Sequence, residues 1–274
     1  MFAFAANSVL CRLALGSNAI DAASFSLIRL IAGAIVLLSI SVFSAAGIPS
    51  LWTRANGWGA GLLATYMLGF SFAYVSLDAG TGALVLFGSV QLTMLLVALW
   101  QGSRPAYLEW SGWLLALAGM MWLTLPGATA PAPAGSLLMA IAGVAWGFYS
   151  LRGRRVSRPL PDTTANFVLA TLVALLPCLF WLDSASLSWK GVLLAIASGA
   201  IASGVGYAVW YAVLPYLSIL RAALLQLSVP VLAAMGGVMF IAEPLAPRLL
   251  VSGFMVLAGI AVAIAGKQKI QRLK

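Results

Sequence analysis

The chain has 274 residues, of which 63% are hydrophobic and 8% are charged, and its formal net charge at pH 7 is +9. Soluble domains carry about 25% charged residues, so this composition excludes a water-soluble protein. The positive charge does not indicate nucleic acid as a partner, because the basic residues gather in loops and in the C-terminal tail, where anionic lipid and membrane insertion explain them.

Apolar stretches of 18 or more residues recur along the chain, separated by short loops, and each is long enough to cross a bilayer as a helix. We therefore predict an all-α membrane protein with ten transmembrane helices. Their expected ranges are 2–15, 24–46, 56–77, 81–100, 107–126, 134–151, 164–182, 190–214, 218–242 and 247–266. The breaks at Asp78 and Pro215 are the shortest, so eight or nine spans remain alternatives. The first range is short, so either its less apolar neighbours complete the helix or the chain begins upstream; no removable signal peptide is expected.

Lys and Arg in the short loops predict the orientation of these helices. Under the ten-span model, ten basic residues fall on the side of the two termini, and three fall on the other side: Arg12, Lys190 and Arg248. We therefore expect a bacterial-type inner membrane protein with both termini in the cytoplasm. The lipid bilayer is its expected surrounding, and a monomer or weak dimer its expected state.

The two halves of the chain, 1–130 and 131–274, match each other at an offset near 140. The matched positions are Ala83 and Ala222, Ser89-Val90 and Ser228-Val229, Asp21 and Asp162, and Ser111-Gly112-Trp113 and Ser252-Gly253-Phe254. Because five spans are an odd number, the second copy must have the opposite orientation. Inverted repeats are typical of secondary transporters, whose substrate site lies between the repeats near the midplane. A duplicated scaffold without transport is the alternative.

Two segments resemble a known family. The first runs from Asn7 to Leu15 and continues with Asp21–Ser26 and Leu27-Ile28-Arg29-Leu30. The second is Phe240-Ile-Ala-Glu243-Pro-Leu, followed by Gly253 and Gly259. Both resemble the EamA-type domain of the drug/metabolite transporter superfamily, whose Gly-Glu turn the second segment matches; the first half differs there, with Gly102-Ser103-Arg104. The resemblance implies two five-helix repeats and suggests an exporter of amino acids and related metabolites.

Polar side chains inside the apolar stretches are candidates for substrate binding, since they are costly in a membrane. Gln91 lies at the centre of the fourth helix. Gln226 lies near the start of the ninth, where Pro230 frees the carbonyl of residue 226. Asn7 lies in the first helix and aligns with Gly147 beside Trp146. Helix packing or a satisfied kink explains each of these equally well.

Aromatic residues repeat at helical spacing in three of the predicted helices. A Tyr or Trp side chain pairs a flat apolar face with one hydrogen-bonding group, which suits a cavity for small apolar or zwitterionic molecules, although such stripes are more often core packing. We predict that substrate binding uses Tyr66, Tyr74, Trp146, Tyr149, Tyr207 and Trp210, together with Asn7, Gln91 and Gln226.

Arg29 lies inside the second helix, where snorkelling to the interface or scaffold pairing is the favoured interpretation and binding of an anionic substrate group the alternative. The chain has no His, and none of its six acidic residues falls in the middle of a predicted span. Proton-coupled carriers usually use such a group, so we expect facilitated transport.

Catalysis is not expected, because the chain has no His and no cluster of metal-binding residues. Cys11 and Cys178 fall within apolar stretches and carry no disulfide or metal signal, so no cofactor is predicted. A lipid or lipid-carrier flippase and a passive channel of the same fold remain the alternative functions, as does a purely structural membrane subunit.

Overall fold

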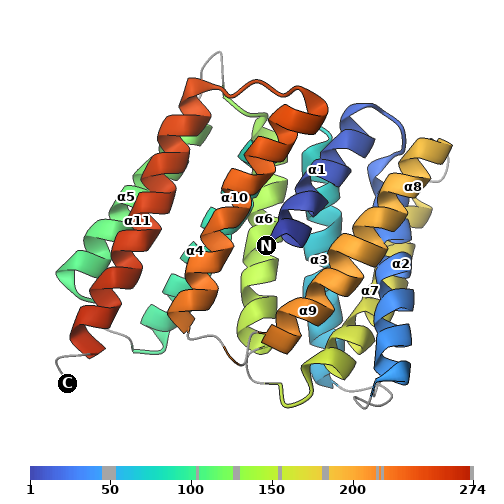
Figure 1. Cartoon of the computed structure of the whole chain (residues 1–274), viewed down its shortest axis with the longest axis horizontal. Coiled ribbons are helices and arrows are strands. Elements are labelled where there is room, and N and C mark those ends of the chain that lie inside the picture. The colour runs from blue at the N-terminus through green and yellow to red at the C-terminus, as the bar shows by residue number, and fades with distance from the viewer. Residues whose placement is uncertain are drawn as a thin grey trace.

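The computed structural model describes residues 1–44, 54–102, 105–125, 130–153, 156–180, 185–213, 216 and 219–271. The regular elements of these residues are helices, which Figure 1 shows side by side. Their bounds are α1 Phe2–Gly16, α2 Ala22–Phe43, α3 Arg54–Tyr74, α4 Ala79–Trp100, α5 Tyr107–Thr124, α6 Pro133–Gly153, α7 Pro159–Leu179, α8 Trp189–Ala197, η2 Ser198–Val205, α9 Gly206–Val213, α10 Ile219–Ile241 and α11 Pro247–Gln271.

Apart from α11, which continues to Gln271, five residues beyond its predicted end, the predicted helix ranges agree with these bounds to within a few residues, with two differences. Helix α7 begins at Pro159, five residues before its predicted start, because the first turn of a helix tolerates proline. The predicted helix at 190–214 contains an unexpected π-helical segment, η2, between α8 and α9. Both differences concern local hydrogen bonding, which hydropathy does not report.

Side-chain caps and one left-handed residue mark where several helices begin and end. Asp21 caps α2 by accepting a hydrogen bond from the backbone N–H of Ser24 at 2.8 Å. At the end of α10, Ala242 has φ 58°, and the N–H of Glu243 donates back to the carbonyl of Gly237 at 3.1 Å. This is a Schellman-type ending, and it fixes the direction in which Glu243 leaves the helix.

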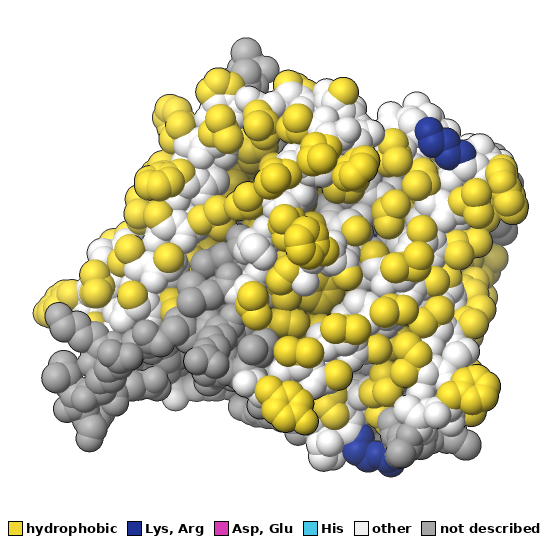
Figure 2. All heavy atoms as spheres, in the orientation of Figure 1, with side chains coloured by type: hydrophobic (Ala, Val, Ile, Leu, Met, Phe, Trp, Pro, Cys, Tyr) yellow, Lys and Arg dark blue, Asp and Glu magenta, His cyan; other side chains and the backbone are white. Residues whose placement is uncertain are grey.

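The outer surface of the helices is apolar, as a membrane requires. Six helical stretches of the described residues are long and apolar enough to cross a membrane, and Phe2–Gly16 and Ser228–Ile241 are shorter apolar helices. On the face in Figure 2, hydrophobic side chains cover the middle, and the Lys and Arg atoms in view lie at the upper and lower edges of the described part. Ile35, Leu96 and Phe254 are each more than half exposed. The chain is therefore a multi-pass helical membrane protein.

Helices α5 and α11 form a closely packed pair at one edge of the molecule (Figure 1). A Cβ added to Gly112 would lie 2.4 Å from the backbone of α11, at Gly259 and Ala263. Helices α2 and η2 approach each other in the same way, since a Cβ on Gly199 would lie 2.3 Å from the carbonyl oxygen of Arg29. Inside a membrane the hydrophobic effect does not drive helices together, so van der Waals packing is the main attraction between them. Small residues strengthen this packing because they allow the backbones to approach closely.

Candidate functional site

Aromatic side chains from several helices meet in the interior around Trp146 of α6. The ring centroid of Trp146 lies 5.0 Å from that of Tyr66 on α3, 5.2 Å from that of Tyr207 on α9 and 5.4 Å from that of Tyr149. Trp146 is 7% exposed, and Tyr149 and Tyr207 are each 1% exposed. We call Trp146 and the rings joined to it the aromatic cluster.

Other rings extend the aromatic cluster toward α1 and along α3. Phe4 of α1 contacts Trp146, Tyr207 and Trp210, with centroid distances of 6.3, 5.8 and 5.9 Å. Phe70 lies between Tyr66 and Tyr74, at 5.5 and 4.7 Å. Most of these pairs have the edge-to-face or tilted geometry that aromatic quadrupoles favour. The cluster therefore draws on both halves of the chain.

Arg29 of α2 points into this interior and is 0% exposed. Its Nε donates to Ser203 Oγ at 3.1 Å, and its Nη2 donates to the Tyr66 hydroxyl at 3.4 Å. The guanidinium carbon lies 4.8 Å from the centroid of the Phe70 ring. Snorkelling to the interface is therefore wrong for Arg29, because interior partners hold the side chain away from lipid and water. Scaffold pairing, the other half of the favoured interpretation, agrees with the contacts to Ser203 and Tyr66.

A polar chain continues from Arg29 to α1 through η2. The hydroxyls of Ser198 and Ser203 both donate to Asn7 Oδ1, at 2.7 and 3.4 Å. All three side chains are at most 2% exposed. In a π-helix the backbone bonds join residues five apart, so Ser198 and Ser203 face the same way, as they would not in an α-helix. Widened turns of this kind are frequent at functional sites.

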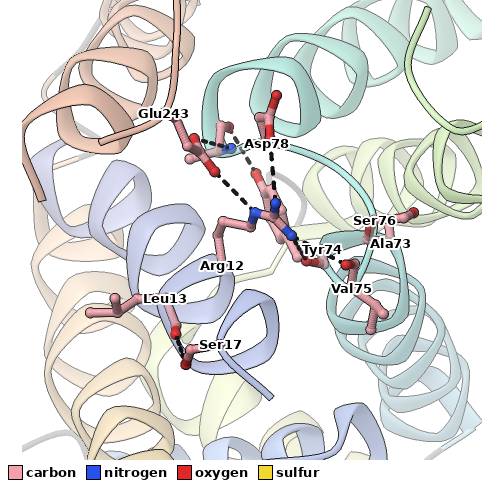
Figure 3. Close-up of polar contacts among 10 residues, drawn as sticks. Arg12, Leu13, Ser17, Ala73, Tyr74, Val75, Ser76, Asp78 and Glu243 are labelled. Atoms are coloured by element: carbon pink, nitrogen blue, oxygen red, sulfur yellow. Dashed lines mark hydrogen bonds and ion pairs between the residues drawn. The ribbon is translucent and has the colours of Figure 1, made fainter. Parts of the chain in front are cut away.

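An ion-pair network lies at the end of the bundle where α1, α3 and α10 finish (Figure 3). Arg12 Nε donates to Glu243 Oε1 at 2.9 Å, and Arg12 Nη2 lies 3.4 Å from Asp78 Oδ1. Arg12 Nη1 donates to the carbonyls of Tyr74 and Val75 at the end of α3. We call this set the Arg12 network.

Glu243 also caps a helix within the Arg12 network. Its Oε2 accepts the backbone N–H of Ala79, the first residue of α4, at 2.9 Å. The positive end of the α4 dipole and the guanidinium of Arg12 therefore act on the same carboxylate. One side chain from the α10–α11 turn thus ties together α1, the α3–α4 turn and α4.

A second network, the Arg152 network, lies at the opposite end, where α6 finishes and α3 and α7 begin. Arg152 forms a two-pronged contact with Asp162, at 2.7 and 2.6 Å, and its Nη2 also donates to Asn56 Oδ1 at 3.2 Å. Asn166 donates to Asp162 at 2.9 Å and to the hydroxyl of Tyr149 at 3.3 Å. This network therefore reaches the aromatic cluster through Tyr149.

The structure brings most of the predicted site residues together. The aromatic cluster and the polar chain contain Asn7, Tyr66, Tyr74, Trp146, Tyr149, Tyr207 and Trp210. The contacts named above do not include Gln91, which is 7% exposed on α4, or Gln226, which is half-buried on α10. Tyr211 follows Tyr207 and Trp210 in the same aromatic stripe of the sequence, and its side chain lies outside the described residues.

Sequence reasoning gave no site role to Phe4, Phe167, Ser198 or Ser203. Phe167 of α7 contacts Tyr207 with a centroid distance of 5.3 Å. Nothing in the local pattern separates these residues from ordinary packing residues of an apolar helix. Ser198, Ala202 and Gly206 are small residues four positions apart, a spacing that favours close approach of a neighbouring helix, and a Cβ on Gly206 would lie 2.9 Å from Ala3 of α1.

Comparison with known proteins shows which sequences and structures this chain resembles. An uncharacterized protein of Pseudomonas aeruginosa is 48% identical over 265 residues, which span 97% of this chain and 92% of that protein. A solved crystal structure shares the fold with a TM-score of 0.68 at 24% identity, covering 96% of each chain. Residues 133–265 match the model of the EamA-like transporter family. The chain thus belongs to the EamA-like transporter family of the drug/metabolite transporter superfamily.

Proposed function

We propose that this protein is a secondary transporter that exports small metabolites, apolar and aromatic amino acids among them, by alternating access. The aromatic cluster and the polar chain form the substrate site, with Gln91 and Gln226 as further contacts. The observation that carries the proposal is the position of the cluster: it lies in the interior, with an ion-pair network at each end of the bundle. A substrate site between two gates is what alternating access requires.

The pattern of helix contacts supports two inverted five-helix repeats. We pair α1 with α6, α2 with α7, α3 with the rod α8–η2–α9, α4 with α10 and α5 with α11. If the repeats are related by symmetry, each contact in one half should have a counterpart between the paired helices. The contact of α3 with α6 corresponds to that of η2 with α1, and the contact of α4 with α6 corresponds to that of α10 with α1. All four contacts occur. The contacts α2–α7, α4–α10 and α5–α11 convert into themselves, and all three occur.

The two ion-pair networks occupy equivalent positions in the two proposed repeats. Arg12 and Arg152 are separated by 140 positions, the offset at which the halves match, and each lies near the end of the first helix of its repeat. With both termini in the cytoplasm of an inner membrane, the Arg12 network closes the outer end and the Arg152 network closes the inner end. Opening one network while the other holds would expose the aromatic cluster to one side at a time.

We further propose that transport is facilitated. The acidic side chains near the site, Asp78, Asp162 and Glu243, are all paired with Arg12 or Arg152 at the ends of the bundle. Asp162 reaches the aromatic cluster through Asn166 and Tyr149, but its charge is balanced by Arg152, as the charges of Asp78 and Glu243 are by Arg12, so none of the three is an unpaired group for proton coupling. An imposed pH gradient is therefore expected not to drive accumulation of substrate in vesicles.

Counterflow in proteoliposomes tests the function. Vesicles that contain the purified protein are loaded with one unlabelled amino acid or metabolite, and entry of the same labelled compound is followed without an ion gradient. Transient accumulation with apolar or aromatic amino acids supports the proposal. Absence of counterflow across the panel, combined with movement of a labelled lipid between leaflets, would replace it with the flippase alternative.

A further inference from the structure

Arg29 carries a buried charge that no carboxylate of the described residues compensates. In the described part of the chain, the acidic partners of arginine belong to Arg12 and Arg152, whereas Arg29 contacts two hydroxyl groups and aromatic rings. Its exposed fraction is 0%, so bulk water does not replace the missing anion. A buried cation without a counter-charge is strongly unfavourable, which makes a structural explanation for Arg29 insufficient.

One nitrogen of the Arg29 guanidinium group has no hydrogen-bond acceptor in the described part of the chain. Nε and Nη2 are engaged by Ser203 and Tyr66, but Nη1 has no acceptor among the described residues. The rings of Phe70 and Tyr66 lie 4.8 and 5.8 Å from the guanidinium carbon and so occupy positions near the group. The two N–H groups of Nη1 therefore lack an acceptor within the described part of the chain, and a bound carboxylate would provide a charge-assisted one.

Building on the proposed transport function, we propose that Arg29 binds the carboxylate of the transported molecule. The substrate class is then an apolar or aromatic monocarboxylate, whose carboxylate meets Nη1 while its apolar part lies against the rings around Tyr66. One buried guanidinium balances one negative charge, so dicarboxylates and phosphate esters are disfavoured. No salt bridge joins Arg29 to an acidic side chain of the described residues, and Asp162, which reaches the aromatic cluster through Asn166 and Tyr149, is paired with Arg152. The described part of the site therefore offers no unpaired counter-charge for a substrate ammonium group.

This last point separates the inference from simple amino-acid transport. A deaminated acid such as 3-phenylpropionate should compete with phenylalanine about equally, because the carboxylate and the ring are both retained. Phenylalaninamide and phenethylamine keep the ring and the ammonium group but lose the carboxylate. They should compete at least about tenfold more weakly, since hydrogen bonds to a charged group lose about 1.5–3 kcal/mol when the partner is absent.

The first test uses the wild-type protein. The four compounds are compared as competitors of labelled phenylalanine in counterflow, and in parallel as ligands that raise the thermal unfolding midpoint of the protein in detergent. Preference for the two carboxylates in both measurements supports the inference. Equal competition by the amide or the amine would overturn it while leaving transport established, and would mean that Nη1 is served by water. If none of these compounds gives counterflow, the proposed transport of aromatic amino acids fails, and the thermal shifts still decide whether carboxylates bind.

The second test replaces the charge. Arg29→Gln should lose the discrimination between carboxylate and amide, while Arg29→Lys should retain part of it. The matched control is Arg248→Gln, because Arg248 is partly exposed and donates to the carbonyl of Trp122 at 2.8 Å. Removing an uncompensated buried charge should leave the unfolding midpoint of the ligand-free protein unchanged or raise it. A large drop in the midpoint for Arg29→Gln, with the carboxylate preference retained, would assign Arg29 a purely structural role.

Discussion

Neutralising Glu243 should open the end of the bundle that the Arg12 network closes. In Glu243→Gln, the single amide oxygen cannot serve both donors that the carboxylate now accepts, the Arg12 Nε–H and the Ala79 N–H, each at 2.9 Å. The amide NH2 must then face one of these donors. The substitution therefore destabilises the closed conformation, which loses the Arg12–Glu243 ion pair and brings two N–H donors face to face. A conformation that is open at this end does not contain these contacts and is not destabilised.

The magnitude follows from the burial of the pair. Breaking a fully buried ion pair costs about 3–5 kcal/mol. Here the side chains of Arg12 and Glu243 are 20% and 10% exposed, and Arg12 keeps the carbonyls of Tyr74 and Val75. We therefore expect about 2 kcal/mol, which multiplies the population of the open conformation by about 30.

Cys11 provides the assay, since this thiol is 0% exposed and is adjacent to Arg12 in α1. In a Cys178→Ser background it is the only cysteine, and the rate of its alkylation by a membrane-impermeant maleimide reports opening. Glu243→Gln should raise this rate by about 30-fold. The matched control is Glu109→Gln, because Glu109 accepts the N–H of Ala106 at the other end of the bundle. Equal rates in both variants would refute the gating role of Glu243.

Three further predictions follow. Arg152→Gln should slow the alkylation of Cys11, because weakening the other end shifts the population away from the conformation open at the Arg12 end; faster alkylation would indicate general loosening instead. Gly112→Ala should lower the thermal unfolding midpoint, since its Cβ would lie 2.4 Å from the α11 backbone and overpacking costs about 1–3 kcal/mol; the control Gly61→Ala, with nothing within 4 Å, should not. Ala242→Gly should raise the midpoint modestly, because φ 58° costs alanine about 1 kcal/mol relative to glycine, and an unchanged or lower midpoint would contradict this.

Hydropathy predicted the helices well because membrane spanning imposes length and apolarity on each of them. The aromatic stripes on α3, α6 and α9 were also informative, since rings at helical spacing share a face, and these faces meet at Trp146. The ten-span inverted arrangement and the gates at its two ends stay predictions. The helix contacts and the positions of Arg12 and Arg152 support them.

The sequence did not predict which residues that are far apart in the chain contact each other in the structure. Arg29 has the same local surroundings as any arginine one-third of the way along an apolar helix, and its partner Ser203 is 174 positions away. Glu243 stands out as part of a turn motif, but its contacts with Arg12 and Ala79 depend on how three separate helices end. Such contacts require knowledge of which helices are neighbours, and that information is not contained in composition or periodicity.

The π-helical segment η2 should allow the continuous helix from Trp189 to Val213 to lose one residue without losing the alignment of its faces. In an α-helix, deleting one residue rotates everything beyond it by about 100° and breaks the alignment of its faces. In η2, loss of the lipid-facing Ile201, which is 66% exposed, would place Ser198 and Ser203 four residues apart. That is the spacing of one face in an α-helix, so both hydroxyls would still point toward Asn7. The contact of these two serines with Asn7 should thus survive the loss of this one residue.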